Sequence, residues 1–131
     1  MLPHYRKVTG YLRDHGVATM MVDCDGNIDE LIPLWLEGGV NFVYPLEVAA
    51  GMDAVKLRKK YGRDLLMMGN IDKRVFPRGK RAIRDEVMSK VPWLVEQGGY
   101  IPCFDHAVPP DVSLENYLYY LDLLKEIYGV R

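Results

Sequence analysis

The sequence predicts an α/β protein in which parallel strands alternate with helices. Four short runs are largely apolar, which is typical of parallel strands covered on both faces. Each run is followed by a segment whose apolar residues recur every three or four positions, as on one face of a helix. The predicted order is α-βα-βα-βα-βα with four parallel strands, in a single domain of residues 1–131.

The first element is predicted to be a helix from Pro3 to His15. Pro3 suits a first helical turn, and Gly16 suits the position after a helix. The first strand is predicted over Val17–Val22. Asn27 or Asp29 is then expected to cap a helix whose apolar residues lie between Ile28 and Leu36, with Gly38 and Gly39 ending it.

The middle of the chain is predicted to hold two more strands. They cover Val40–Leu46 and Leu65–Met68, and a helix over Met52–Tyr61 lies between them. A polar, basic loop from Lys73 to Lys80 should lead to a helix over Ala82–Val91.

The C-terminal part is predicted to contain the fourth strand and the longest helix. Pro92 should break the preceding helix, so residues 93–97 are expected to form a turn. The fourth strand is predicted over Tyr100–Phe104. Ser113 should cap a last helix that extends to Tyr128.

Composition excludes several classes of function. The net charge of −1 provides no field that would favour nucleic acid or a membrane surface. No apolar run approaches the ~20 residues of a membrane-spanning helix, and the first residues do not resemble a secretory signal. The two cysteines form neither a disulfide framework nor a CxxC pattern, so a cytoplasmic location is expected.

Polar side chains follow every predicted strand. In successive βα units with right-handed crossovers the strands share one direction, so these side chains should gather on one rim. The residues concerned are Asp23 and Asp25 after the first strand, Glu47 after the second, Asn70 and Asp72 after the third, and Asp105 and His106 after the fourth.

Each of the main candidates also has a purely structural interpretation. Asp23 and Asp25 suit a divalent metal or a shared proton, although an Asp-Gly pair is equally typical of a turn. Glu47 lies in an apolar stretch, so it should face a polar cavity or form a salt bridge. His106 suits proton transfer or metal ligation, or it satisfies loop carbonyls.

Several stretches carry a resemblance to a known family. They are Val22–Ile28, Pro45–Asp53, Leu57–Gly62, Gly69–Lys73, Gly98–Pro102, His106–Pro110 and Leu114–Asn116. Together they resemble the uroporphyrinogen decarboxylase superfamily, which also contains corrinoid-dependent methyltransferases. The resemblance implies a (β/α)8 TIM barrel of which this chain is the C-terminal half. Because four strands cannot close a barrel, self-association is expected, with an N-terminal half-barrel partner or an open sheet as alternatives.

The resemblance implies two alternative reactions. A decarboxylase would remove carboxylate arms from a tetrapyrrole without a cofactor, with His106, Asp23, Asp25 and Glu47 as catalytic groups. Asn70, Asp72 and Asp105 would then contact the substrate.

A methyltransferase would instead move a methyl group from a methylcobalamin protein to a thiol or a pterin. Asp23, Asp25 and His106 would hold a divalent metal such as zinc, in positions where the methyltransferases have histidine and cysteine ligands. A third possibility is an inactive half-barrel that self-associates or binds a partner, and the isolated chain is expected to be inactive in every case.

Overall fold

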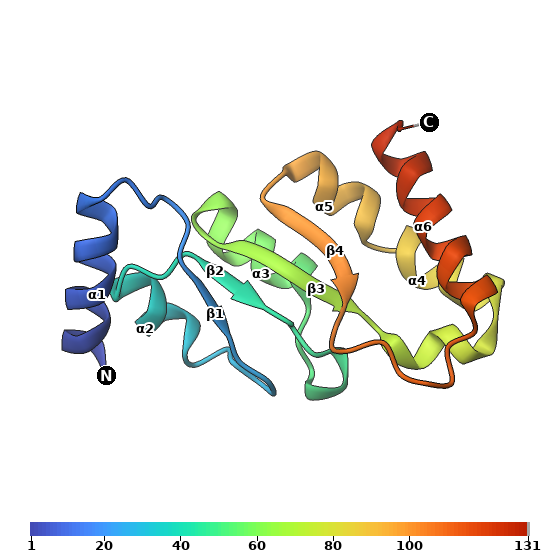
Figure 1. Ribbon diagram of the computed structural model, residues 1–131, viewed down its shortest axis with the longest axis horizontal. Coiled ribbons are helices and arrows are strands. Elements are labelled where there is room, and N and C mark those ends of the chain that lie inside the picture. The colour runs from blue at the N-terminus through green and yellow to red at the C-terminus, as the bar shows by residue number, and fades with distance from the viewer. Residues whose placement is uncertain (131) are drawn as a thin grey trace.

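The sheet contains four parallel strands that pair in the order of the sequence (Figure 1). They are β1 (Met21–Asp23), β2 (Phe42–Tyr44), β3 (Leu66–Ile71) and β4 (Tyr100–Phe104). This computed structural model describes residues 1–130, so Arg131, the last residue of the predicted domain, lies outside the described residues. The fold is α/β with the sheet order of half a TIM barrel, which confirms the predicted class.

The helices follow the strands from one edge of the sheet to the other (Figure 1). The helix α1 lies beyond β1, and α6 lies beyond β4. The α-helices are α1 (Leu2–Asp14), α2 (Ile32–Glu37), α3 (Ala54–Tyr61), α4 (Lys80–Met88), α5 (Val91–Gln97) and α6 (Leu114–Tyr128), and short 3-10 helices cover Val48–Ala50, Gly62–Asp64 and Lys73–Arg78. Over residues 1–130, no helix is both long enough and apolar enough to cross a membrane.

The two faces of the sheet differ in burial. Val43, Met67 and Tyr100 are buried on the face that packs against the helices, and they belong to one row of paired strand positions. Because neighbouring positions on a strand point to opposite faces, the residues between them form the other face. We call this second face the open face; its apolar residues are Met21, Phe42, Leu66, Met68 and Ile101.

The first two strands are shorter than the sequence predicts. The expected strands Val17–Val22 and Val40–Leu46 are reduced to three paired residues each. The side chain of Asn41 accepts a hydrogen bond from the Met20 amide and donates one to the Ala18 carbonyl, so a side chain replaces part of the strand pairing. Pairing of β2 ends before Leu46, whose φ of 57° is incompatible with a strand.

Two helix starts also differ from the prediction. Residues 93–97 are helical, because Pro92 occupies the first turn of α5, where its missing N–H is not needed. Neither predicted residue caps α2: Asn27 instead accepts a hydrogen bond from the Asp29 amide in a local turn. The predicted cap Ser113 is confirmed, since its hydroxyl accepts from the Asn116 amide.

Candidate functional site

The carboxyl ends of three strands bring three predicted catalytic side chains together. Asp25 follows β1, Glu47 follows β2 and His106 follows β4. One ligand atom of each residue lies within 4.8 Å of the other two. Nε2 of His106 is 3.9 Å from Oδ1 of Asp25, which is too long for a direct hydrogen bond. We call these three residues the rim triad.

Glu47 is held between two other loops. Its Oε2 accepts a hydrogen bond of 2.6 Å from the backbone amide of Gly26, next to Asp25. Its Oε1 lies 3.9 Å from Nζ of Lys73, in the loop after β3. An amide and an ammonium group therefore offset the cost of burying most of this carboxylate, and they fix it beside Asp25.

Asp105 connects the same loops from below the surface. It is only 1% exposed, and its two carboxylate oxygens accept hydrogen bonds from the Val48 amide at 3.0 Å and the Lys73 amide at 3.1 Å. The residue thus positions the segments that carry Glu47 and Lys73. Because both oxygens accept from backbone amides, the structure gives Asp105 a structural role, and its contact with the substrate stays a prediction.

Asn70 has a similar structural role. Its side-chain oxygen accepts from the Ala54 amide, and its side-chain nitrogen donates to the carbonyls of Leu46 and Met52. The backbone of Asn70 has a φ of 63°, a conformation that asparagine adopts more readily than most residues. Asn70 is 2% exposed, and its contact with the substrate stays a prediction.

Asp72, the third predicted substrate-binding residue, is paired with Arg74. Its Oδ1 accepts from the Arg74 backbone amide and guanidinium, and its Oδ2 accepts from a second guanidinium nitrogen. Hydrogen bonding to the Arg74 side chain lowers the pKa of Asp72 below its usual value. The carboxylate therefore caps the following 3-10 helix and does not join the rim triad.

A small pocket opens beside the rim triad. Its volume is about 250 Å³, and Asp23, Asp25, Tyr44, Pro45, His106 and Ala107 line it. Asp23 lies in this pocket but outside the triad, so the metal-ligand set predicted from the sequence, Asp23, Asp25 and His106, shares two residues with the triad and stays a prediction.

Tyr44 is a pocket residue that the sequence analysis missed. Burial raises its pKa first, and the charges of Cys103, Asp23 and Asp25 raise it further, so the phenol keeps its proton. A tyrosine at the end of a predicted parallel strand is a signal that could have identified it. Lys73 was likewise missed, because it lies within a basic loop segment.

Comparison with known protein families agrees with this fold. The family described as "Uroporphyrinogen decarboxylase (URO-D)" matches residues 1–127, which include all four strands. The chain belongs to the uroporphyrinogen decarboxylase family. No curated protein matches the sequence closely enough to be reported as a relative.

This member of the uroporphyrinogen decarboxylase family places no cysteine in the rim triad. Burial, followed by the charge of Asp105, raises the pKa of the Cys103 thiol to about 11. Burial therefore favours the protonated thiol when no metal is bound. Sγ of Cys24 lies 3.7 Å from the carbonyl oxygen of Asp25, its neighbour in the chain.

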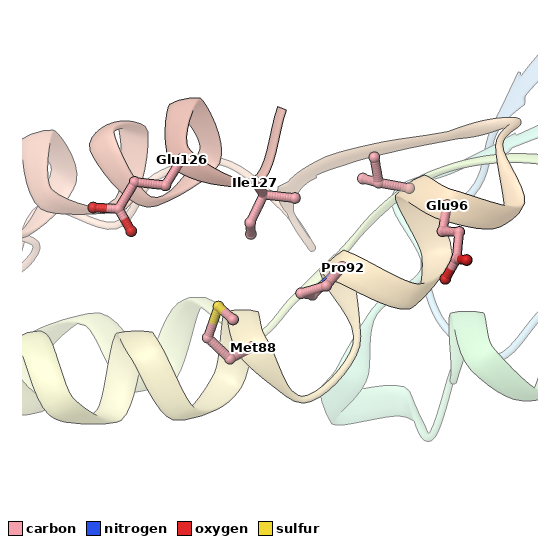
Figure 2. Close-up of a pocket in the computed structure, with 6 residues that line it drawn as sticks. Met88, Pro92, Glu96, Glu126 and Ile127 are labelled. Carbon is pink, nitrogen blue, oxygen red and sulfur yellow. The ribbon is translucent and has the colours of Figure 1, made fainter. Parts of the chain in front are cut away.

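A second hollow in this uroporphyrinogen decarboxylase family member lies away from the rim triad (Figure 2). It has a volume of about 390 Å³ and is lined by Met88, Pro92, Val95, Glu96, Glu126 and Ile127. Ile127 of α6 faces Met88 and Pro92 across the gap. Val95 and Glu96 lie in the last turn of α5, shortly before β4 begins, so this hollow lies toward the amino ends of the strands, opposite the triad. It contains none of the predicted site residues.

Proposed function

We propose that the rim triad of this family member holds a divalent cation, and that the completed barrel acts as a corrinoid-dependent methyltransferase. The observation that carries the proposal is the convergence of Asp25, Glu47 and His106, whose ligand atoms lie within 4.8 Å of one another. The isolated chain supplies only one half of such a barrel, so the proposal concerns the assembled enzyme.

The chemistry of the triad fits a cation of intermediate hardness. One imidazole and two carboxylates suit Zn²⁺ or Mn²⁺. Asp25 and His106 are exposed, so an ion can reach them, and their separation of 3.9 Å leaves lone pairs free on both. Glu47 needs no rearrangement, because the Gly26 amide already orients it. A bound cation would supply Lewis-acid activation of the group that accepts the methyl.

The ligand types favour a pterin acceptor over a thiol. Thiolate ligands favour softer metal ions, whereas oxygen and nitrogen ligands favour harder metal ions. With two carboxylates, one imidazole and no thiolate, the triad is better matched to a nitrogen or oxygen of a pterin.

The charge of the rim argues against a tetrapyrrole with several carboxylate arms. Asp23, Asp25 and Glu47 are acidic and gather at one end of the sheet, where the nearest ammonium group is that of Lys73. Like charges at the mouth of a site repel a polyanionic substrate. A methylated small molecule meets no comparable repulsion.

The carboxy-lyase reaction on a tetrapyrrole is the second candidate. His106 beside Asp25 is the observation that favours it, because an imidazole next to a carboxylate can hold and deliver a proton near neutral pH. In that reaction the site needs no cation, so metal binding distinguishes the two candidates.

The test is equilibrium dialysis of the purified chain against Zn²⁺ and Mn²⁺, followed by analysis of bound metal. We expect one ion per chain, and at least tenfold weaker binding after Asp25→Ala, Glu47→Ala or His106→Ala. Asp23→Ala is the matched control, because Asp23 lines the same pocket without belonging to the triad. Equal loss in the control, or no bound metal at all, would contradict the proposal and leave the second candidate.

A further inference from the structure

We infer that a pocket at the amino ends of β1, β2 and β3 binds the phosphate monoester group of a small organic molecule. The pocket has a volume of about 560 Å³, and its lining includes Arg13, Gly39, Asn41, Arg63, Asp64 and Leu66. We call it the amino-end pocket. A volume of this size is typical of sites that hold a small molecule. The rim triad lies at the other ends of the strands, so the inference does not depend on the proposed function.

Two guanidinium groups reach the amino-end pocket from separate elements. Arg13 lies in the last turn of α1, and Arg63 lies in the 3-10 helix between α3 and β3. Among the ion pairs of residues 1–130, none includes Arg13 or Arg63. Both guanidinium groups therefore keep charged donors for an anionic ligand, and such hydrogen bonds are stronger than those between neutral groups.

The helix α1 holds Arg13 over the loop between α2 and β2. The buried hydroxyl of Thr9 donates a hydrogen bond of 2.7 Å to the carbonyl of Gly38 in this loop. Arg13 lies four residues after Thr9, on the same face of the helix. A Cβ atom placed on Gly39 would lie only 3.0 Å from a guanidinium nitrogen of Arg13, and φ of this glycine is +90°. Glycine at this position therefore leaves the room that the guanidinium occupies at the pocket wall.

Arg63 lies beside a second, buried arginine. Its guanidinium contacts Gly98, and a nitrogen of Arg58 lies 3.2 Å from the position of a Cβ on Gly99, the next residue. Arg58 is 4% exposed and donates to the carbonyls of Gly62 and Gly99, while its Nε has no partner in the described part of the chain. Burial, followed by the charge of Arg63, lowers the pKa of Arg58. An anion bound to Arg63 would offset this repulsion between the two guanidinium groups.

The charges around the amino-end pocket favour a dianion. Asp64 supplies the carboxylate of the lining, whereas Arg13 and Arg63 supply two positive charges and Arg58 lies next to Arg63. A phosphate monoester carries about −1.5 to −2 charges at pH 7, and a carboxylate carries a single one. Guanidinium groups also match the oxygens of a phosphate through paired hydrogen bonds. A phosphate group therefore suits this pocket better than a carboxylate.

The rest of the lining suits an apolar body attached to the phosphate. Leu36 and Leu66 contribute apolar side chains to the pocket. Asn41 fixes the wall before β1, because its side chain accepts from the Met20 amide and donates to the Ala18 carbonyl, both at 2.9 Å. A wall that is already in place lowers the cost of ordering when a ligand binds. Since the chemistry of TIM barrels lies at the carboxyl ends of the strands, the amino-end pocket is a binding site and not a second catalytic centre.

The test is isothermal titration calorimetry of the chain with phenyl phosphate, at low ionic strength and without divalent cations. We expect one molecule of phenyl phosphate per chain. Benzoate, which has the same ring but one negative charge, should bind about tenfold more weakly, and so should inorganic phosphate, which lacks the ring. Equal or tighter binding of benzoate or of inorganic phosphate would overturn the inference, as would the absence of any heat of binding with phenyl phosphate.

Substitutions locate the site. Arg13→Gln and Arg63→Gln should each weaken the binding of phenyl phosphate about tenfold, whereas Asp64→Asn should tighten it about twofold because a like charge is removed. Arg84→Gln is the matched control and should leave binding unchanged, because Arg84 is exposed on α4 and lies outside the pocket. Unchanged binding in both pocket arginine variants, or an equal loss in the control, would overturn the inference. Circular dichroism verifies that the variants are folded, since all three arginines are exposed.

Discussion

Removal of the Asp105 carboxylate should destabilise the fold strongly. Within residues 1–130 this carboxylate forms hydrogen bonds with backbone amides and none with another side chain. Its two oxygens accept from the amides of Val48 and Lys73 at 3.0 and 3.1 Å, and the residue is 1% exposed. A hydrogen bond to a charged group contributes about 1.5–3 kcal/mol to the free energy of unfolding. Since the two amides lie in loops that can regain water, we take the lower value for each and expect Asp105→Ala to lose about 3 kcal/mol.

Asp105→Asn should lie between the wild type and the alanine variant, because the amide oxygen retains one acceptor while its NH₂ group faces the second backbone N–H. The assay is urea denaturation followed by circular dichroism, with variants compared at equal slope. Asp111→Ala, in the same loop but exposed, is the control and should change the free energy of unfolding by less than about 0.5 kcal/mol. A loss below about 1 kcal/mol for Asp105→Ala would refute the role assigned to this residue.

Three further variants test other parts of the structure. Gly69→Ala should destabilise the fold by more than about 3 kcal/mol, because φ is +107° and a Cβ would lie 1.7 Å from the Pro45 carbonyl oxygen. The control is Gly62→Ala, where φ is also positive but the added Cβ would meet no other atom. It should lose only about 1 kcal/mol in the same urea assay. Burial raises the pKa of Cys103 from 9.0 to about 11. The protonated thiol therefore contributes fully to the free energy of unfolding below pH 9, and this contribution is lost as the pH rises through 11. Cys103→Ala should flatten this part of the stability profile, and an unchanged profile would contradict the raised pKa of Cys103. Lys73→Met removes a cation 3.9 Å from one proposed metal ligand and should tighten Mn²⁺ binding severalfold in dialysis, because the Gly26 amide still orients Glu47; weaker binding would contradict this prediction.

The sheet was predictable because the apolar pattern continues along each strand. Runs such as Tyr100–Phe104 are apolar on both faces and lead into helical patterns, which favours parallel strands whatever their exact length. Strand ends were less predictable. The side chain of Asn41 takes over hydrogen bonds that strand pairing would otherwise make, and this depends on a contact with residues about twenty positions earlier.

The candidate site was predictable in part for the same reason. Parallel strands place their carboxyl ends together, so the convergence of Asp25, Glu47 and His106 follows from the fold. The structural roles of Asn70 and Asp105 do not follow from it. Each satisfies backbone groups of a neighbouring loop, and no local pattern shows which polar residue after a strand will do so.

Carboxylates at this rim divide into two kinds by the partners they already have. Asp105 accepts from the amides of Val48 and Lys73, and Asp72 accepts from the amide and guanidinium of Arg74, so both carboxylates make their hydrogen bonds within the protein. Asp25 is exposed and only approaches His106, which leaves its lone pairs available. A bound ion or substrate gains most from polar groups that are held in place but still have a free lone pair. Asp25 is therefore a better guide to function than a carboxylate whose hydrogen bonds are already made within the protein.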